Sequence, residues 1–219
     1  MKRLIPLLLA VLLASCGSNQ TPTATPFEYT DTIVLVQPDL SEGLTINQAL
    51  ALRASSREYS AEALSLEQLS GVMWAAAGIN RPESKHLTAP SAMALYPIRV
   101  YAFTPEGVYR YDEMSHTLQR VVEGDHRELS AAQEFAYTAP LNLVYIADMS
   151  RYEGLNLTPA KAEFLAGQDA AGYAENVNLY AAGHNLKAIT RGSLKSAEVL
   201  TLLDLEKGHT VVLAQTVGK

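Results

Sequence analysis

Apolar positions recur every three or four residues after Ser65, which is the pattern of a helix with one buried face. Ser65 and Gln68 form a capping box at its start, because the serine oxygen can accept a backbone N–H while the glutamine side chain reaches back. Gly78 is a good stop for this helix. The apolar face consists of Leu66, Leu69, Val72, Met73 and Ala76.

Three other stretches have helical patterns. The longest begins at Thr158-Pro159, where threonine is a favourable cap and proline a favourable first residue. It is rich in Ala and Gly from residue 164 to 182, and Gly183 can end it. Small side chains along a long helix let another helix approach closely, either within one chain or in a dimer. Shorter helices are expected over 46–54, ending near Arg53 and Arg57, and over 195–205.

Short apolar runs predict the strands. Three of them are separated by turn residues and predict an antiparallel meander: 98–104, 107–112 and 117–122. The run LNLVYIA at 141–147 is expected to be a buried central strand, and 210–218 a C-terminal strand. An extended arm is expected at 32–36. Helices and strands in this order predict an α+β fold without internal repeats.

Composition and charge exclude several classes of protein. The chain has 219 residues and is 48% hydrophobic, which is enough for the core of one domain. Its net charge of −6 comes without a Lys/Arg cluster, which argues against a nucleic-acid partner. It has neither a P-loop nor a G-x-G-x-x-G motif after a strand. Its five histidines are scattered, so we expect no metal site.

The N-terminus resembles a bacterial lipoprotein signal. Lys2 and Arg3 precede an apolar run, 4–14, that is too short to span a bilayer. The run ends in Leu13-Ala14-Ser15-Cys16, a pattern in which Cys16, the only cysteine, becomes the lipidated first residue of the mature protein. We therefore expect a signal peptide at 1–15, an anchor, tether and arm at 16–43, one domain at 44–219, and a location at the extracytoplasmic side of a bacterial cell envelope. A plain secretory signal is the alternative.

Three short segments carry candidate chemistry. Residues 53–59 (RASSREY) place two arginines beside serine hydroxyls, a donor set that suits a phosphate. Residues 88–98 (TAPSAMALYPI) include a predicted helix start, where backbone N–H groups would be free. Thr190-Arg191-Gly192 follows a short apolar run and ends in a residue without a side chain. In this order the segments resemble the flavin-binding segments of the nitroreductase family, and the resemblance extends from about Leu44 to Lys219.

The resemblance implies a role for each residue of the first segment. Arg53 corresponds to the position that meets the phosphate and ribityl chain of FMN, and Ser55 supplies a hydroxyl beside it. Arg57 corresponds to the position that meets the N1/O2 edge of the ring. A cation at that edge stabilises the negative charge of a reduced flavin.

Four further cofactor contacts are implied by the same resemblance. The backbone N–H groups of Arg191 and Gly192 match the position that hydrogen-bonds flavin N5 and O4, where a side chain would block the hydride path. Lys219 lies near the place of a second phosphate cation. Gln133 is a candidate contact for the pyrimidine edge of the ring.

The implied fold is nitroreductase-like: a mostly antiparallel sheet flanked by helices, in a domain-entwined homodimer. Pro90, Ser91 and Ala92 would then come from the neighbouring subunit and pack against its flavin ring. The long small-residue helix would pack at the dimer centre.

The implied activity is that of an FMN-dependent oxidoreductase. It would pass hydride through flavin N5 between a donor such as NAD(P)H and a nitroaromatic, quinone or similar acceptor, with no catalytic side chain required. Relatives with the stretch 95–97 (LYP) include dehydrogenases that oxidise azoline rings in peptides, so oxidation of a peptide or azoline-type substrate is an alternative. A lipoprotein that binds flavin without turnover is another, because Leu87, Ala94 and Ala171 depart from the family pattern.

Overall fold

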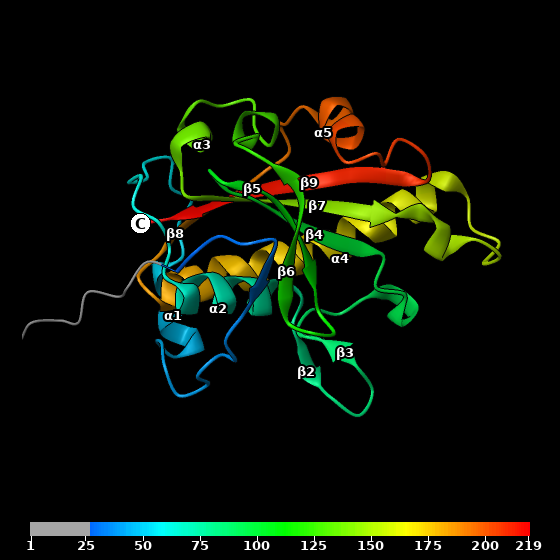
Figure 1. The fold of residues 1–219 in the computed structure, drawn as a ribbon. Coiled ribbons are helices and arrows are strands. Elements are labelled where there is room, and N and C mark those ends of the chain that lie inside the picture. The colour runs from blue at the N-terminus through cyan, green and yellow to red at the C-terminus, as the bar shows by residue number, and fades with distance from the viewer. Residues whose placement is uncertain (1–26) are drawn as a thin grey trace, which may run out of the picture.

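The computed structural model describes residues 27–219, and a seven-stranded sheet forms its centre. The strand order is β1-β6-β5-β4-β7-β9-β8, and every neighbouring pair is antiparallel. The strands are β1 (Thr32–Val34), β4 (Ile98–Phe103), β5 (Gly107–Asp112), β6 (Thr117–Glu123), β7 (Leu141–Asp148), β8 (Lys187–Arg191) and β9 (His209–Gly218). A separate hairpin joins β2 (Ile79–Arg81) to β3 (His86–Leu87) and projects away from the sheet (Figure 1).

The predicted strands are confirmed. β4, β5 and β6 form the meander, and β7 lies between β4 and β9 with residues 141–147 all buried. The predicted arm at 32–36 forms the edge strand β1, which pairs only with β6 in the sheet. Neither β8 as a full strand nor the β2–β3 hairpin was predicted, since their apolar runs are too short to show a period.

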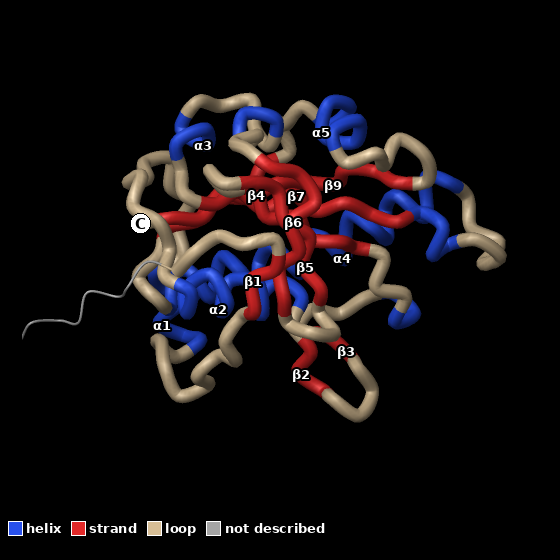
Figure 2. Tube along the Cα trace, in the orientation of Figure 1, coloured by secondary structure: helices blue, strands red, loops and turns tan. Residues whose placement is uncertain are grey.

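Helices cover both faces of the sheet (Figures 1 and 2). On one face lie α1 (Ile46–Leu52), α2 (Leu66–Ala77) and the 25-residue α4 (Pro159–Gly183). On the other face lie α3 (Phe135–Thr138) and α5 (Ser196–Leu202). Side chains of β7 alternate between the two cores: Leu143 and Tyr145 pack with the α2 and α4 side, whereas Val144 and Ile146 pack with the α5 side.

Local signals set the helix ends. Ser65 and Gln68 form the predicted capping box, and Thr158 accepts the N–H of Lys161 at the start of α4. The last predicted helix is shorter than expected, because the chain turns after α5 instead of continuing to residue 205. Gly78 does end α2, but its backbone is extended rather than left-handed. Glycine is required at position 78 for steric reasons, since a Cβ there would lie 2.2 Å from Trp74 Cδ1.

Helices α2 and α4 pack together, and the alanines predicted to allow close packing, Ala166, Ala170, Ala174 and Ala181, are buried in the core that α4 shares with α2. At the crossing, a Cβ on Gly71 of α2 would lie 1.8 Å from the hydroxyl oxygen of Tyr180 in α4. Among the helices of residues 27–219, none combines the length and the apolar character that a bilayer crossing needs. The signal peptide and Cys16 lie outside the described residues, so the lipoprotein assignment stays a prediction.

Candidate functional site

Residues 53–60 run along the outer edge of β8, the last strand of the sheet. Arg53 caps the end of α1, where its N–H donates to Ala49 O at 2.8 Å. Beyond it, Ser55 forms a bridge with Ala188 of β8, and the N–H of Ser56 donates to Ala188 O at 3.1 Å. The backbone of this segment therefore satisfies part of the sheet edge and fixes the two arginines relative to β8.

The guanidinium groups of Arg53 and Arg57 are available for a ligand. Both residues are exposed, and neither side chain makes a hydrogen bond or ion pair with any residue from 27 to 219. The hydroxyl of Ser55 is likewise without a partner in that range, and Ser55 lines a hollow of about 330 Å³ between the segment, Asn178 of α4 and Lys187. Two free cations and a hydroxyl suit an anionic group.

Tyr59 joins this segment to the end of the sheet, a role that no sequence pattern indicated. Its ring stacks on Phe135 of α3 with centroids 6.1 Å apart, and its hydroxyl donates to Ser56 O at 2.8 Å. Burial raises the pKa of Tyr59, and the nearby guanidinium groups of Arg191 and Arg57 oppose that shift. Tyr59 therefore lies among the residues that were predicted as cofactor contacts.

The side chain of Arg191 is structural. It is only 6% exposed and donates three hydrogen bonds: Nε to Thr216 Oγ1 at 3.1 Å, Nη1 to Ser130 O at 2.7 Å and Nη2 to Asn142 Oδ1 at 3.1 Å. No carboxylate is among these partners, and burial lowers the pKa of the guanidinium to about 10. Only the backbone of Arg191 is left for the predicted contact with a cofactor.

Gly192 leaves an open space in front of the sheet end. It is exposed, and a Cβ at this position would have no atom of residues 27–219 within 4 Å. Its backbone is not in the left-handed region either. Neither crowding nor backbone strain within the described chain therefore requires glycine here. The vacant Cβ position is what a close approach by a group from outside the chain would need.

Backbone hydrogen bonds place Gln133 near Gly192 and Lys219 near residues 53–60. Ala132 N donates to Ser193 O at 3.1 Å, so Gln133, which is exposed, stands beside the Gly192 turn. Lys219 O accepts the N–H of Ser60 at 2.8 Å, and its ammonium group pairs with Glu62. The C-terminal lysine is thus fixed next to residues 53–60, which we call the arginine segment, and its ammonium group already binds one carboxylate.

The prediction of a helix at Pro90-Ser91-Ala92 with free N–H groups is wrong. The chain forms a short 3₁₀ turn, Ala92–Ala94, and the N–H of Ala92 donates to Asp169 Oδ1 at 3.1 Å. The hydroxyl of Ser91 donates to Asp169 Oδ2 at 2.5 Å and accepts the N–H of Tyr96 at 2.8 Å. The buried carboxylate of Asp169, on α4, accepts hydrogen bonds from the Ser91 hydroxyl and the Ala92 N–H, so these donors are not free.

The turn that follows is strained. Met93, Ala94 and Tyr96 all have positive φ angles, 56°, 54° and 47°, although none of them is glycine. Each such residue lowers the stability of the folded chain by about 1–2 kcal/mol relative to an unstrained backbone. Hydrogen bonds from Arg99 to Tyr96 O at 3.1 Å and from Arg151 to Leu95 O at 3.2 Å help to hold this shape. We call residues 90–96 the strained loop.

The strained loop and the arginine segment lie at different places along α4. Asp169 of α4 holds the loop, whereas Asn178 of α4 lines the hollow with Ser55. Nine helical residues separate the two, a distance of roughly 14 Å at 1.5 Å per residue. The loop lines a hollow of its own, which shares no lining residue with that of Ser55. Within one chain the strained loop and residues 53–60 therefore line two separate hollows.

Comparison with known proteins identifies the family. The nitroreductase family pattern matches residues 50–219, which include the arginine segment, the strained loop and Gly192. The chain belongs to the nitroreductase family. A nitroreductase-type protein from Methanocaldococcus jannaschii is 30% identical over 188 residues, which is 81% of this chain and 92% of that protein.

Solved nitroreductase structures share the fold. A nitroreductase-type protein from Ralstonia eutropha superposes with a TM-score of 0.81 at 36% identity, over 87% of this chain and 90% of the other. The NADPH:FMN oxidoreductase from Vibrio harveyi has a TM-score of 0.58 at 19% identity, over 79% and 67% of the two chains. This nitroreductase is therefore a flavin-linked oxidoreductase enzyme with the α+β fold that was predicted.

The residues present fit a flavin. The free guanidinium groups of Arg53 and Arg57 match the charge of its phosphate and of its reduced ring. The vacant Cβ position of Gly192 leaves room for a flat ring to reach the backbone. In the described chain these features share one end of the sheet, near Tyr59.

Proposed function

We propose that this nitroreductase is an FMN-dependent oxidoreductase that transfers hydride between a donor such as NAD(P)H and a nitroaromatic, quinone or similar acceptor. The observation that carries the proposal is the pairing of two uncommitted guanidinium groups with a glycine that nothing in the described chain requires. Arg53 and Ser55 hold the phosphate, while Arg57 lies at the N1/O2 edge of the ring.

We further propose that the flavin site is divided between two copies of the chain. The separation of the strained loop from the arginine segment along α4 supports this arrangement, in which Pro90, Ser91 and Ala92 face the flavin held by the partner. The apolar surface of α1 beside Arg53 also supports it, because Leu50 and Leu52 are 55% and 61% exposed in a single chain.

A bound flavin supplies the acceptance and donation of hydride, and the side chains supply position and charge. The cation at residue 57 favours the reduced, anionic form of the ring. In the proposed dimer the strained loop would form one wall beside the partner's flavin ring. Its rigid hydrogen bonds to Asp169 keep that wall in place when reactants exchange.

Purified protein containing residues 27–219 tests the proposal. We expect it to bind FMN and to be bleached by NADH under nitrogen. Arg53→Ala removes one charge-assisted phosphate contact and should weaken FMN binding by roughly ten- to a hundredfold. Gly192→Val fills the vacant Cβ position and should also abolish binding, without loss of stability, because nothing in the described chain lies within 4 Å.

Lys207→Ala is the matched control, since Lys207 is an exposed cation in the turn before β9. It should bind FMN as the unmodified protein does. A protein that takes up no FMN would refute the proposal. A flavoprotein that NADH does not bleach would instead favour the dehydrogenase or the non-catalytic alternative.

A further inference from the structure

The β2–β3 hairpin and the strained loop enclose a second hollow of about 500 Å³. The hairpin contributes Arg81 and His86, and the loop contributes Pro90, Ser91 and Tyr96. Because Pro90 and Ser91 belong to the wall that is proposed to face the partner's flavin, this hollow opens where a reactant would meet the ring. It therefore has the position of a reactant site.

Arg81 and His86 stand on the same face of the hairpin. They are direct cross-strand partners, and the His86 ring lies 5.7 Å from the ring of Tyr96. Arg81 uses Nε to bind Asn80 Oδ1 and Nη2 to bind Leu87 O. A guanidinium group has five N–H donors, so these two bonds hold its plane and leave the other donors free within the described chain.

The charge of this hollow is one-sided. Of the described residues that line it, none is Asp or Glu, although the whole chain has a net charge of −6. A permanently charged guanidinium group, the His86 imidazole and the Tyr96 side chain line it, whereas the Ser91 hydroxyl already donates its hydrogen to Asp169. Such a donor set selects oxyanions, since an oxyanion accepts hydrogen bonds and balances the charge.

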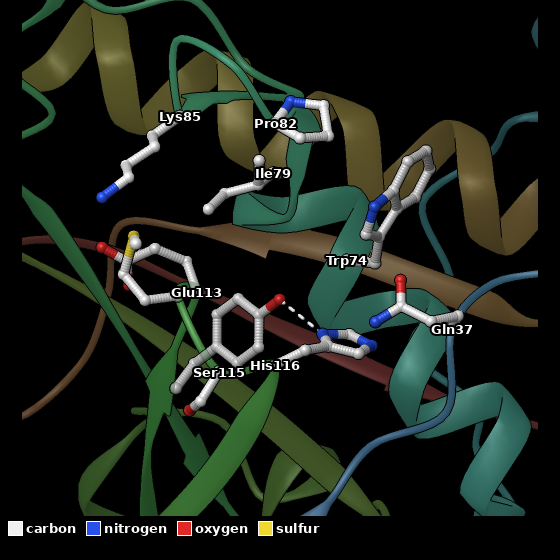
Figure 3. Close-up of a pocket in the computed structure, with 10 residues that line it drawn as sticks. Gln37, Trp74, Ile79, Pro82, Lys85, Glu113, Ser115 and His116 are labelled. Atoms are coloured by element: carbon white, nitrogen blue, oxygen red, sulfur yellow. Dashed lines mark hydrogen bonds between the residues drawn. The ribbon is translucent and has the colours of Figure 1, made fainter.

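The other side of the same hairpin differs. There, Lys85 faces a cavity of about 310 Å³ together with Trp74, Glu113 and His116 (Figure 3). The carboxylate of Glu113 accompanies the lysine in that cavity, so its charge is mixed. The hairpin thus presents one cation to each of two cavities, and Lys85 provides a natural control for Arg81.

We infer that the hollow beneath Arg81 binds a carboxylate or phosphate group on the reactant that meets the flavin. The inference rests on the proposed function and specifies the class of reactant. The oxyanion belongs either to the acceptor, as an aromatic carboxylate, or to the donor, as the phosphates of a nicotinamide dinucleotide. Arg81 is the residue that discriminates charged from neutral reactants.

Matched reactants test this inference on the dimeric, FMN-loaded protein. The acceptor pair is 4-nitrobenzoate and 4-nitrobenzamide, and the donor pair is NADH and 1-benzyl-1,4-dihydronicotinamide, which lacks phosphates. Arg81→Gln should lower the charged-to-neutral ratio of kcat/KM roughly tenfold in one of the two pairs, the effect of one partly exposed charge-assisted contact. Lys85→Gln should leave both ratios unchanged.

Binding without turnover provides a separate readout. Benzoate and NAD⁺ are titrated into the protein by NMR, with benzamide and nicotinamide as their neutral controls. Arg81→Gln should weaken the binding of only the charged ligand in the affected pair. Failure of the unmodified protein to turn over even neutral reactants would refute the proposed function, yet the titrations would still decide this inference. Unchanged ratios and unchanged affinities in Arg81→Gln would overturn it.

Discussion

Arg191 gives a sharp test of how this fold stabilises a buried cation. Its guanidinium group is 6% exposed and donates to Ser130 O, Asn142 Oδ1 and Thr216 Oγ1, with no carboxylate among its partners. We consider two substitutions. Arg191→Met removes the charge and all three donors, whereas Arg191→Lys retains the charge but not the planar fork.

The two costs can be estimated from these contacts. Hydrogen bonds from a charged donor contribute about 1.5–3 kcal/mol each, so methionine loses roughly 5–9 kcal/mol in gross terms. Several kcal/mol are recovered, because a desolvated charge is removed. The net loss is about 2–4 kcal/mol. Lysine keeps a charge that is more strongly hydrated and cannot reach three divergent acceptors, so it should be at least as destabilising as methionine.

Urea unfolding followed by circular dichroism measures both variants at one fixed protein concentration, since the proposed dimer would contribute to the apparent stability. Arg110→Met is the control, because Arg110 is exposed on β5 and should change stability by less than about 0.5 kcal/mol. An Arg191→Lys protein that is as stable as the unmodified one would refute the reasoning. So would an Arg191→Met protein that matches the control.

Two further predictions concern packing and pH. Gly71→Ala should lower the free energy of unfolding by about 1–2 kcal/mol, because its Cβ would meet the Tyr180 hydroxyl. In a Tyr180→Leu background most of that loss should disappear, and fully additive effects of the two substitutions would contradict this. Burial lowers the pKa of His116, so the folded chain binds fewer protons than the unfolded chain below about pH 6.5. The stability from neutral His116 is therefore complete above that pH and is lost as pH falls. His116→Gln should reduce the pH dependence of the melting temperature between about pH 5 and 7. An unchanged slope of melting temperature against pH would exclude His116 as the source of that dependence.

Local signals made much of the fold predictable. The capping box at Ser65 and the Thr158-Pro159 start give specific hydrogen bonds to neighbouring residues, so the sequence alone indicates where α2 and α4 begin. Alternation and turn residues identified the meander for the same reason. The Ala- and Gly-rich stretch indicated close helix packing, and its residues Ala166, Ala170, Ala174 and Ala181 are buried in the core that α4 shares with α2.

Long-range polar contacts made the rest unpredictable. The loop at Ser91 was expected to begin a helix, but Asp169, 78 residues away in sequence, accepts its donors. The β2–β3 hairpin is too short to show an apolar period, and a side-chain hydrogen bond from Arg81 to Leu87 O adds to its backbone pairing. Likewise, nothing in the sequence distinguishes the buried Arg191 side chain from the exposed Arg53, because the environment of each depends on tertiary packing.

Mixed dimers test the central claim that two chains share each flavin site. An Arg53→Ala, Arg57→Ala chain lacks the cations, and a Pro90→Trp chain blocks the loop wall while leaving the Ser91 bonds to Asp169. Each should bind little FMN as a homodimer. In a heterodimer isolated with two different tags, both lesions fall at one site and the other site is intact.

The amount of FMN per isolated heterodimer is therefore the decisive measurement. The account predicts about half the flavin content of the unmodified dimer, with the recovered flavin reducible by NADH. Circular dichroism confirms that both variant chains are folded. A heterodimer that remains colourless while the unmodified protein is yellow would contradict the account, because each chain would then build its flavin pocket alone.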